Sequence, residues 1–292
     1  MEAAGKRHVW HTSRTDEFRV WNLSDLHLGA RGCSEKLLNK DVKAIAEDPY
    51  SFWIGGGDYA EFIGYSDKRF DPDAVADWIS VKDLGDLGKR TMQKVRDVLY
   101  PIRSKCLGLL IGNHERKFEL HTQHESLHYW LCEELGVPYL GYCCLFDLHF
   151  CLLSGSVAKP RLMKKLPPRR GNIRHQDSNV FRVFAHHGAG YAVTPGGKLN
   201  KLISAMNAFE ADLYFLGHVH DQMARREPVL SADAACTTLT QKVRLGMISG
   251  SYLKTYNQGS ISYGEQKMYR PTSLGAAVAK IRPATRHMEA AV

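Results

Sequence analysis

The chain has 292 residues, of which 44% are hydrophobic and 24% charged, and its formal net charge is +8. This composition is typical of a globular protein that buries a core, and it excludes disordered, collagen-like and low-complexity chains. No segment approaches the ~20 consecutive apolar residues that a membrane-spanning helix needs. The N-terminal residues also lack the apolar run of a signal peptide, so we expect a soluble, cytoplasmic protein.

Apolar, β-rich segments alternate with helical patterns, which predicts an α/β fold with a largely parallel core. The first half is predicted to form a strand over Phe18–Leu23, a helix over Ser34–Glu47, a strand over Phe52–Ile54, helical residues over 71–104, a strand over Cys106–Ile111 and a helix over Glu119–Leu135. The second half is predicted to form two β-rich runs over 139–154, a strand over Phe181–Ala185, a helix over Lys198–Ala208, a strand over Asp212–Leu216 and two short strands within 237–253. No linker separates two cores, so we expect one domain over residues 1–282 and a frayed polar tail over 283–292.

Most of the excess positive charge lies between Lys159 and Arg174, a segment with seven basic residues and no acidic one. Its three prolines argue against a helix, which predicts a basic loop inserted in a nearly neutral domain. Such a loop could bind phosphates or a nucleic-acid backbone, and it could equally be a solvated connection.

Five of the predicted strand ends are followed by polar residues that can bind metals, each beside a glycine. The motifs are SDLHLG, GGGDY, GNHE, AHHG and GHVH, with the candidates Asp25, His27, Asp58, Asn113, His114, His186, His187, His218 and His220. Ligands of open α/β sheets bind beyond the carboxyl ends of the strands, so these loops can meet in space. Because alternate residues of an extended chain share a side, the D-x-H and H-x-H spacings would each present two ligands if the turn stays extended.

Carboxylate, amide and imidazole groups together suit borderline divalent metals, so we expect Mn²⁺ first, with Fe, Zn, Co or Ni as alternatives. The all-oxygen ligand set of a calcium site is different. A single ion seldom needs seven ligands, whereas two ions that share one carboxylate would use them all and would suit in-line attack on phosphorus. The motifs therefore predict a dinuclear metal centre that hydrolyses phosphoesters.

The ordered set D-x-H, GD, GNH(E), H and GH-x-H, which runs from Asp25 to His220, resembles the calcineurin-like metallophosphoesterase superfamily. That superfamily includes phosphoprotein phosphatases, purple acid phosphatases, nucleotide phosphodiesterases and double-strand-break repair nucleases. The resemblance implies a four-layer α/β/β/α sandwich with a dinuclear metal site between its two sheets. The stretch from HHGAG to GHVHD is also similar to stand-alone phage and prophage members.

The resemblance also implies which residues bind each ion. The first metal ion would be bound by Asp25, His27 and His220. Both ions would be bridged by Asp58, and the second would be bound by Asn113, His218 and one histidine of AHHG.

Two candidates compete for the AHHG ligand, and we prefer His186, which directly follows the predicted strand, with His187 as the alternative. His114 matches the histidine that stabilises the transition state or protonates the leaving group. With Asp58 and Asn113, it completes the residues expected to be catalytic.

We expect hydrolysis by a hydroxide that bridges the two metal ions, preferably of phosphodiesters, as in a nuclease or a nucleotide phosphodiesterase. A phosphatase acting on phosphomonoesters of proteins or nucleotides is the alternative. A metal-free interaction scaffold, as in a retromer subunit of the same superfamily, is the alternative of another class. The expected partner is a phosphoester substrate, with nucleic acid among the candidates. No membrane partner is expected, and the sequence identifies no protein partner. Phosphate contacts are expected from Arg116, Lys164, Lys165, Arg169 and Arg170.

Overall fold

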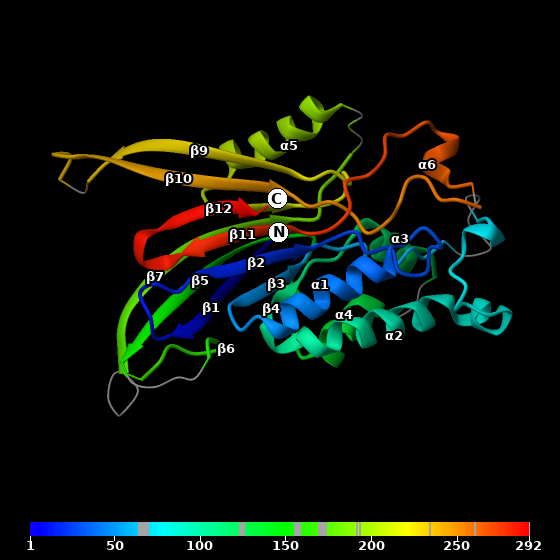
Figure 1. Ribbon diagram of the computed structural model, residues 1–292, viewed down its shortest axis with the longest axis horizontal. Coiled ribbons are helices and arrows are strands. Elements are labelled where there is room, and N and C mark those ends of the chain that lie inside the picture. The colour runs from blue at the N-terminus through cyan, green and yellow to red at the C-terminus, as the bar shows by residue number, and fades with distance from the viewer. Residues whose placement is uncertain are drawn as a thin grey trace.

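The computed structural model describes residues 1–63, 70–122, 126–154, 159–168, 174–190, 192, 194–233, 235–259 and 261–291, which form two β-sheets (Figure 1). The five-stranded sheet has the order β12–β11–β2–β3–β4, with β2 (Phe18–Leu23), β3 (Ser51–Gly55), β4 (Cys106–Leu109), β11 (Ala277–Arg282) and β12 (His287–Ala291). The seven-stranded sheet has the order β6–β1–β5–β7–β8–β10–β9, with β1 (Glu2–His11), β5 (Cys143–Ser154), β6 (Arg161–Met163), β7 (Arg174–His186), β8 (Leu213–Leu216), β9 (Met223–Ala232) and β10 (Leu239–Ile248).

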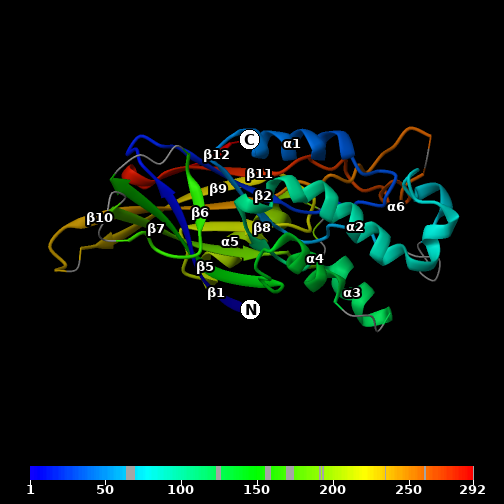
Figure 2. The same cartoon turned by 90° about the horizontal axis from the view of Figure 1, so that it is seen from below.

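Helices cover the outer faces of both sheets, which gives the four layers of an α/β/β/α sandwich (Figures 1 and 2). The described helices are α1 (Glu35–Glu47), α2 (Leu87–Leu99), α3 (Asn113–Thr122), α4 (Leu127–Leu135), α5 (Pro195–Ala208) and α6 (Tyr263–Gln266). The core between the sheets includes Phe18, Phe52, Phe150 and Phe181, each at most 2% exposed. A second apolar cluster joins α1, α2 and α4 to the five-stranded sheet, and a third joins α5 to the seven-stranded sheet.

Several predicted elements are confirmed where the apolar pattern was strong. The strand β2 has the bounds predicted for it, and α1 begins one residue after Ser34. In α1, the buried residues Leu38, Val42 and Ile45 recur at helical spacing, so one face of the helix packs on the sheet. Burial of that apolar face is what holds the helix in place.

The core is mixed, so the expectation of a largely parallel core is wrong. The strands that carry the motifs are parallel: β2 pairs with β3, β3 pairs with β4, and β7 pairs with β8. Antiparallel neighbours extend both sheets, namely β11 on β2, β5 on β7 and β9 on β10. The strand β1 was not predicted because it is rich in polar residues and half exposed. It is held in the sheet by parallel pairing with β5.

The tail expected to be frayed is instead an ordered strand. After the short 3₁₀ turn Pro283–Thr285, Arg286 adopts φ 51° and reverses the chain. β12 then pairs antiparallel with β11, and Met288, 2% exposed, joins the core between the sheets. Strand pairing therefore orders a segment that its small, polar residues did not mark as a strand.

The helix expected over Glu119–Leu135 begins earlier, at Asn113, so the GNHE motif opens α3 rather than lying in a turn. The chain is helical again in α4, which ends at Gly136 in a left-handed cap. None of the described helices is long and apolar enough to cross a membrane.

Candidate metal centre

The motif residues meet at one end of the sandwich, where strands of both sheets end. Asp25 and Asp58 follow β2 and β3, and Asn113 comes shortly after β4. From the other sheet, His187 follows β7 and the GHVH motif follows β8. Because parallel strands end at one edge of a sheet, five loops that are far apart in the chain converge here.

Five of the candidate ligands have a left-handed backbone, which residues other than glycine rarely adopt. They are Asp25 (φ 55°), His27 (φ 50°), Asp58 (φ 52°), His218 (φ 70°) and His220 (φ 49°). The chain therefore turns at each of these residues, so the condition that the D-x-H and H-x-H turns stay extended is not met. Such strain costs about 1–3 kcal/mol per residue and is typical of sites where function dictates the geometry.

Gly57 allows the loops after β3 and β4 to touch. Its φ is 94°, and a Cβ at this position would lie 2.7 Å from the backbone of Gly112 and from the His187 ring. A side chain here would separate the loops that carry Asp58 and Asn113.

One group of candidate ligand atoms comes from Asp25, His27 and His220, and these atoms lie within 4.8 Å of one another. The His220 Nε2 atom is 3.1 Å from Asp25 Oδ1 and 3.2 Å from His27 Nε2. Asp25 is fully buried, and its second oxygen, Oδ2, accepts a hydrogen bond from the His218 backbone N–H at 2.9 Å. One carboxylate oxygen and two imidazole nitrogens therefore converge on one point.

A second group comes from Asp58, His187 and His218, again with ligand atoms within 4.8 Å of one another. The His187 Nε2 atom lies 3.3 Å from Asp58 Oδ2 and 3.1 Å from Asn113 Oδ1. Its other nitrogen, Nδ1, donates to the backbone carbonyl of Gly56 at 2.8 Å, which fixes the ring with Nε2 toward the cluster.

The electrostatics of both groups favour a bound cation. Burial alone would lower the pKa of His27, but Glu61 and Asp58 outweigh it and raise that pKa to about 9. In the same way, Asp58 outweighs burial at His187 and raises its pKa to about 10. Burial would raise the pKa of Asp58, yet His187 and His114 hold it well below its usual range. Buried carboxylates that remain ionised beside imidazoles fit divalent metal ions.

The histidine preferred from the sequence, His186, is corrected to His187. The His186 ring packs against Phe184 and Tyr142, and its Nδ1 accepts a hydrogen bond from the Gly188 backbone N–H. His187 is fully buried and belongs to the second ligand group. The strand β7 extends to His186, one residue beyond its predicted end, and the candidate ligand position moves with it to His187.

Glu115, the last residue of GNHE, has a structural role that the sequence analysis missed. It is 1% exposed, and its carboxylate accepts backbone N–H bonds from Gly112 (3.0 Å), Asp58 (3.0 Å) and Tyr59 (2.6 Å). Burial, followed by the charge of Asp58, raises its pKa to about 7. This one side chain joins the two loops that present Asp58 and Asn113. Its position directly after His114 in the GNHE motif was the sequence feature that could have indicated this role.

We expect Glu115→Ala to destabilise the fold by about 3 kcal/mol or more, because it leaves buried backbone N–H groups without an acceptor. Urea unfolding followed by circular dichroism measures the loss. The matched control is Leu120→Ala on the same helix, since Leu120 is 68% exposed. Equal stability of the two variants would contradict the role assigned to Glu115.

Glu61 orients two histidines and was also missed. Its Oε2 lies 2.6 Å from His27 Nδ1, and its backbone carbonyl accepts from His114 Nδ1 at 2.6 Å. These contacts direct the Nε2 atom of each ring away from Glu61. The His114 Nε2 atom lies 4.0 Å from Asp58 Oδ2, and the backbone N–H of His114 donates to Asp58 Oδ1 at 2.8 Å.

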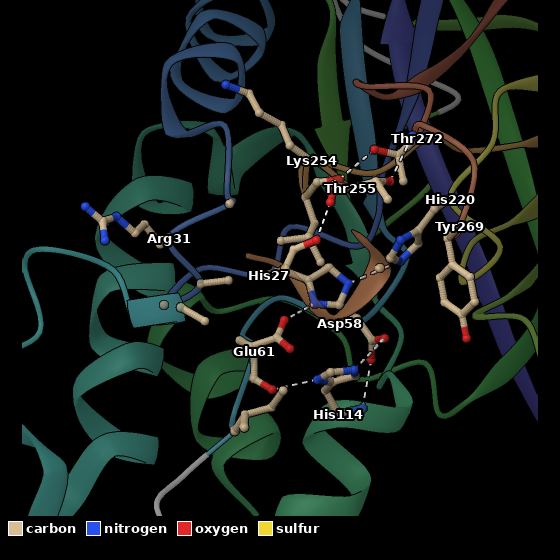
Figure 3. A pocket seen from close by; sticks show the side chains of 18 of the residues that line it. His27, Arg31, Asp58, Glu61, His114, His220, Lys254, Thr255, Tyr269 and Thr272 are labelled. Carbon is tan, nitrogen blue, oxygen red and sulfur yellow. Dashed lines mark hydrogen bonds and ion pairs between the residues drawn. The ribbon is translucent and has the colours of Figure 1, made fainter. Parts of the chain in front are cut away.

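A cavity of about 1070 Å³ adjoins the two ligand groups (Figure 3). His27, Asp58, His114 and His220 line it, so the candidate ligands and the candidate proton donor face the same space. Cationic side chains line other parts of its wall: Arg31, Lys117, Lys198, Lys254, Lys267 and Arg270. The arrangement can receive an anionic substrate beside the candidate metal positions.

The described part of the basic loop, residues 159–168, lies away from this cavity, which corrects the substrate contacts expected from Lys164 and Lys165. Trp10 on β1 donates to the Lys165 carbonyl and pairs with Cys151 on β5. Cys151 lies eight residues along β5 from Cys143, the partner of His186, and at about 3.4 Å per residue this is roughly 27 Å. Figure 1 accordingly shows β6 well separated from α6, which lies at the right-hand end of the molecule.

The basic residues expected to contact phosphate lie in different parts of the chain. Lys164 and Lys165 follow β6 at the far end, and Arg169 and Arg170 lie outside the described residues. Arg116 is exposed on α3 and is not among the residues that line the cavity, whereas its neighbour Lys117 is. The cavity's remaining cations were not singled out from the sequence because they are scattered along it, in separate loops and in α5.

The family model described as calcineurin-like phosphoesterase matches residues 18–222, from β2 through the GHVH motif. The chain belongs to this family. The match contains all five motifs and ends before β9, so the segment that follows β10 lies beyond it. The membership agrees with the fold and with the ordered motif set.

No curated protein matches this chain. Among solved structures, one similar chain is a conserved uncharacterized protein of Streptococcus pneumoniae TIGR4, described as a predicted phosphoesterase. It is 12% identical, with a TM-score of 0.32, over 91% of this chain and 84% of that one. A double mutant of Vps29 from Entamoeba histolytica is 9% identical, with a TM-score of 0.35, over 94% of this chain and 98% of that one.

Proposed function

We propose that this protein is a phosphoester hydrolase that uses two divalent metal ions, with Mn²⁺ as the first candidate. The observation that carries the proposal is the pair of adjacent ligand groups, each of carboxylate and imidazole, beside a cavity lined by cations. In this proposal Asp25, His27 and His220 bind one ion. The other ion is bound by His187, His218 and Asn113, and Asp58 bridges the two.

Two bound ions would activate water as the nucleophile and neutralise charge on the phosphoryl oxygens. The chain's own residues would orient the substrate and supply a proton. His114 faces the cavity, and its Nδ1 donates to the Glu61 carbonyl, so its Nε2 is available to protonate a leaving oxygen. Lys117 and Lys198 would attract the substrate's negative charge to the same space.

We favour phosphodiesters over phosphomonoesters because six cationic side chains from several elements line the cavity. A monoester carries its charge on a single phosphate, whereas a diester within a longer molecule brings further phosphates. A scaffold without metal ions is disfavoured, because both ligand groups retain their carboxylates and imidazoles.

The proposal is tested by removing metal ions with a chelator, desalting, and adding Mn²⁺ back during assays with bis(p-nitrophenyl) phosphate and p-nitrophenyl phosphate. We expect no turnover without metal and restored turnover with Mn²⁺, with the diester hydrolysed at the higher kcat/KM. A preference for the monoester would overturn the diester assignment. No turnover with Mn²⁺, Zn²⁺ or Fe²⁺ on either compound would overturn the enzymatic function.

A further inference from the structure

The chain between β10 and β11 forms a wall of the cavity that lies outside the family match. Residues 253–259 and 261–272, here called the C-terminal wall, contribute Lys254, Tyr269 and Arg270 to the cavity lining (Figure 3). The family match ends at residue 222. These residues therefore line the cavity with cationic and aromatic side chains that the shared motifs do not supply.

Hydrogen bonds tie the C-terminal wall together. The Thr255 hydroxyl donates to the Arg270 carbonyl at 3.1 Å and accepts from the Thr272 backbone N–H at 3.1 Å. The Thr272 hydroxyl donates to the Leu253 carbonyl at 2.8 Å, and the Tyr256 hydroxyl donates to a carbonyl farther along the wall. These hydrogen bonds join distant parts of the segment and hold its backbone in a defined path.

The C-terminal wall is also joined directly to the candidate metal centre. Just before it, the Tyr252 backbone N–H and the Ser251 hydroxyl both donate to the Asp25 carbonyl at 2.9 Å. The Lys254 backbone N–H donates to the Gly32 carbonyl at 3.0 Å, in the loop that follows His27. These hydrogen bonds therefore fix the position of the C-terminal wall relative to the first ligand group.

The charges around the cavity are nearly all positive once the ligand groups are set aside. Lys254 and Arg270 come from the C-terminal wall, Arg31 from the loop after β2, and Lys117 and Lys198 from α3 and α5. Among the described lining residues, the acidic side chains are the ligand Asp58, the orienting Glu61 and a single further acid, Asp71. Such a field selects a polyanion.

The number of these cations favours a substrate with several phosphates. The cations belong to the C-terminal wall, the loop after β2, α3 and α5, and a chain with repeated phosphates can contact several of them at once. Apolar residues, including Phe62, Phe70 and Ile261, line the cavity as well and suit uncharged parts of such a chain. In a duplex the bases are paired inside the helix, whereas an unpaired strand can present its bases to these apolar residues.

We propose that the C-terminal wall binds the phosphates that flank the scissile one, and that the substrate is a single strand of nucleic acid. This inference rests on the proposed function, because the scissile phosphate is the one beside the metal ions. Lys254 and Arg270 are the wall's phosphate contacts in this proposal, and Tyr269, which lines the same cavity (Figure 3), offers a ring on which a base can stack.

The test compares the wild type with the double variant Lys254→Gln/Arg270→Gln. The probe is a fluorescein-labelled ten-nucleotide oligothymidine, and its binding is followed by fluorescence anisotropy over a range of salt concentrations. EDTA is present so that the strand stays intact. The matched control is Lys36→Gln/Lys40→Gln, which removes two exposed charges from α1 outside the cavity lining.

We expect Lys254→Gln/Arg270→Gln, the wall variant, to bind the oligonucleotide about 10-fold or more weakly than the wild type at low salt. The slope of log affinity against log salt should fall in magnitude by about 1.4, at roughly 0.7 per lost phosphate contact. Wild-type affinity in the wall variant, an equal loss in the α1 control, or no binding by the wild type would overturn the inference.

The proposed function is measured separately, through the hydrolysis of bis(p-nitrophenyl) phosphate by the unaltered chain with Mn²⁺. Failure of that assay counts against the proposed hydrolase activity. Failure of the anisotropy comparison counts against nucleic-acid binding by the C-terminal wall. Binding of a self-complementary duplex more tightly than of the single strand would also overturn the inference.

Discussion

Turnover of bis(p-nitrophenyl) phosphate is expected to fall on the order of 10³-fold in Asp58→Asn, the largest effect of any single change in this protein. In the proposed centre Asp58 is the carboxylate shared by both metal ions, and its side chain already lies 3.3 Å from His187. The amide keeps the shape of the side chain but removes the negative charge that would bind both cations. Steady-state kinetics with saturating Mn²⁺ measure the effect.

The matched control for this change is Asp97→Asn, because Asp97 is an exposed acid on α2 with 60% of its side chain accessible. It should keep the wild-type rate. If Asp58→Asn kept more than about a tenth of the wild-type turnover, the shared-carboxylate assignment would be wrong.

The second large effect separates the two neighbouring histidines. We expect His187→Ala to lose one of the two metal ions and about 100-fold or more in turnover, because its Nε2 lies with Asp58 and Asn113. His186→Ala should keep both ions, since its ring packs on Phe184 and Tyr142. Metal content by mass spectrometry and kinetics are measured on both variants, with circular dichroism to show that each is folded. Metal loss in His186→Ala alone would reverse the assignment.

Much of the candidate site could be predicted from the sequence because its residues follow apolar strands. Asp25 and Asp58 come directly after strands that the apolar pattern located well, and the ends of parallel strands converge at one edge. The left-handed backbone of these residues could not be predicted, because neither aspartate nor histidine requires it. Tertiary packing, such as the close approach at Gly57, imposes that geometry.

The choice between the two AHHG histidines shows how one residue of error changes a site. Side chains alternate across a strand, so a shift of one residue exchanges the two faces. The pattern placed the end of the strand at Ala185, but hydrogen bonding to β5 and β8 continues through His186. That pairing commits His186 to the strand and leaves His187 to enter the cluster.

The substrate side of the site was the least predictable part. A run of basic residues such as Lys164 and Lys165 is conspicuous in a sequence, yet the topology places it at the far end of the seven-stranded sheet. Lys254 and Arg270 are isolated in the sequence and reach the cavity only because the C-terminal wall folds back onto the loop after β2. Charge density along a chain therefore locates a binding surface only when the fold brings the segment to the site.

The central claim, that two metal ions bind between the ends of these strands, is tested most directly by metal stoichiometry. The full chain is stripped with a chelator, loaded with Mn²⁺, desalted and measured by inductively coupled plasma mass spectrometry against protein concentration. We predict about two ions per chain in the wild type and fewer than two in Asp58→Asn. A wild-type chain that retains no metal after loading with Mn²⁺, Zn²⁺ or Fe²⁺ would contradict the account.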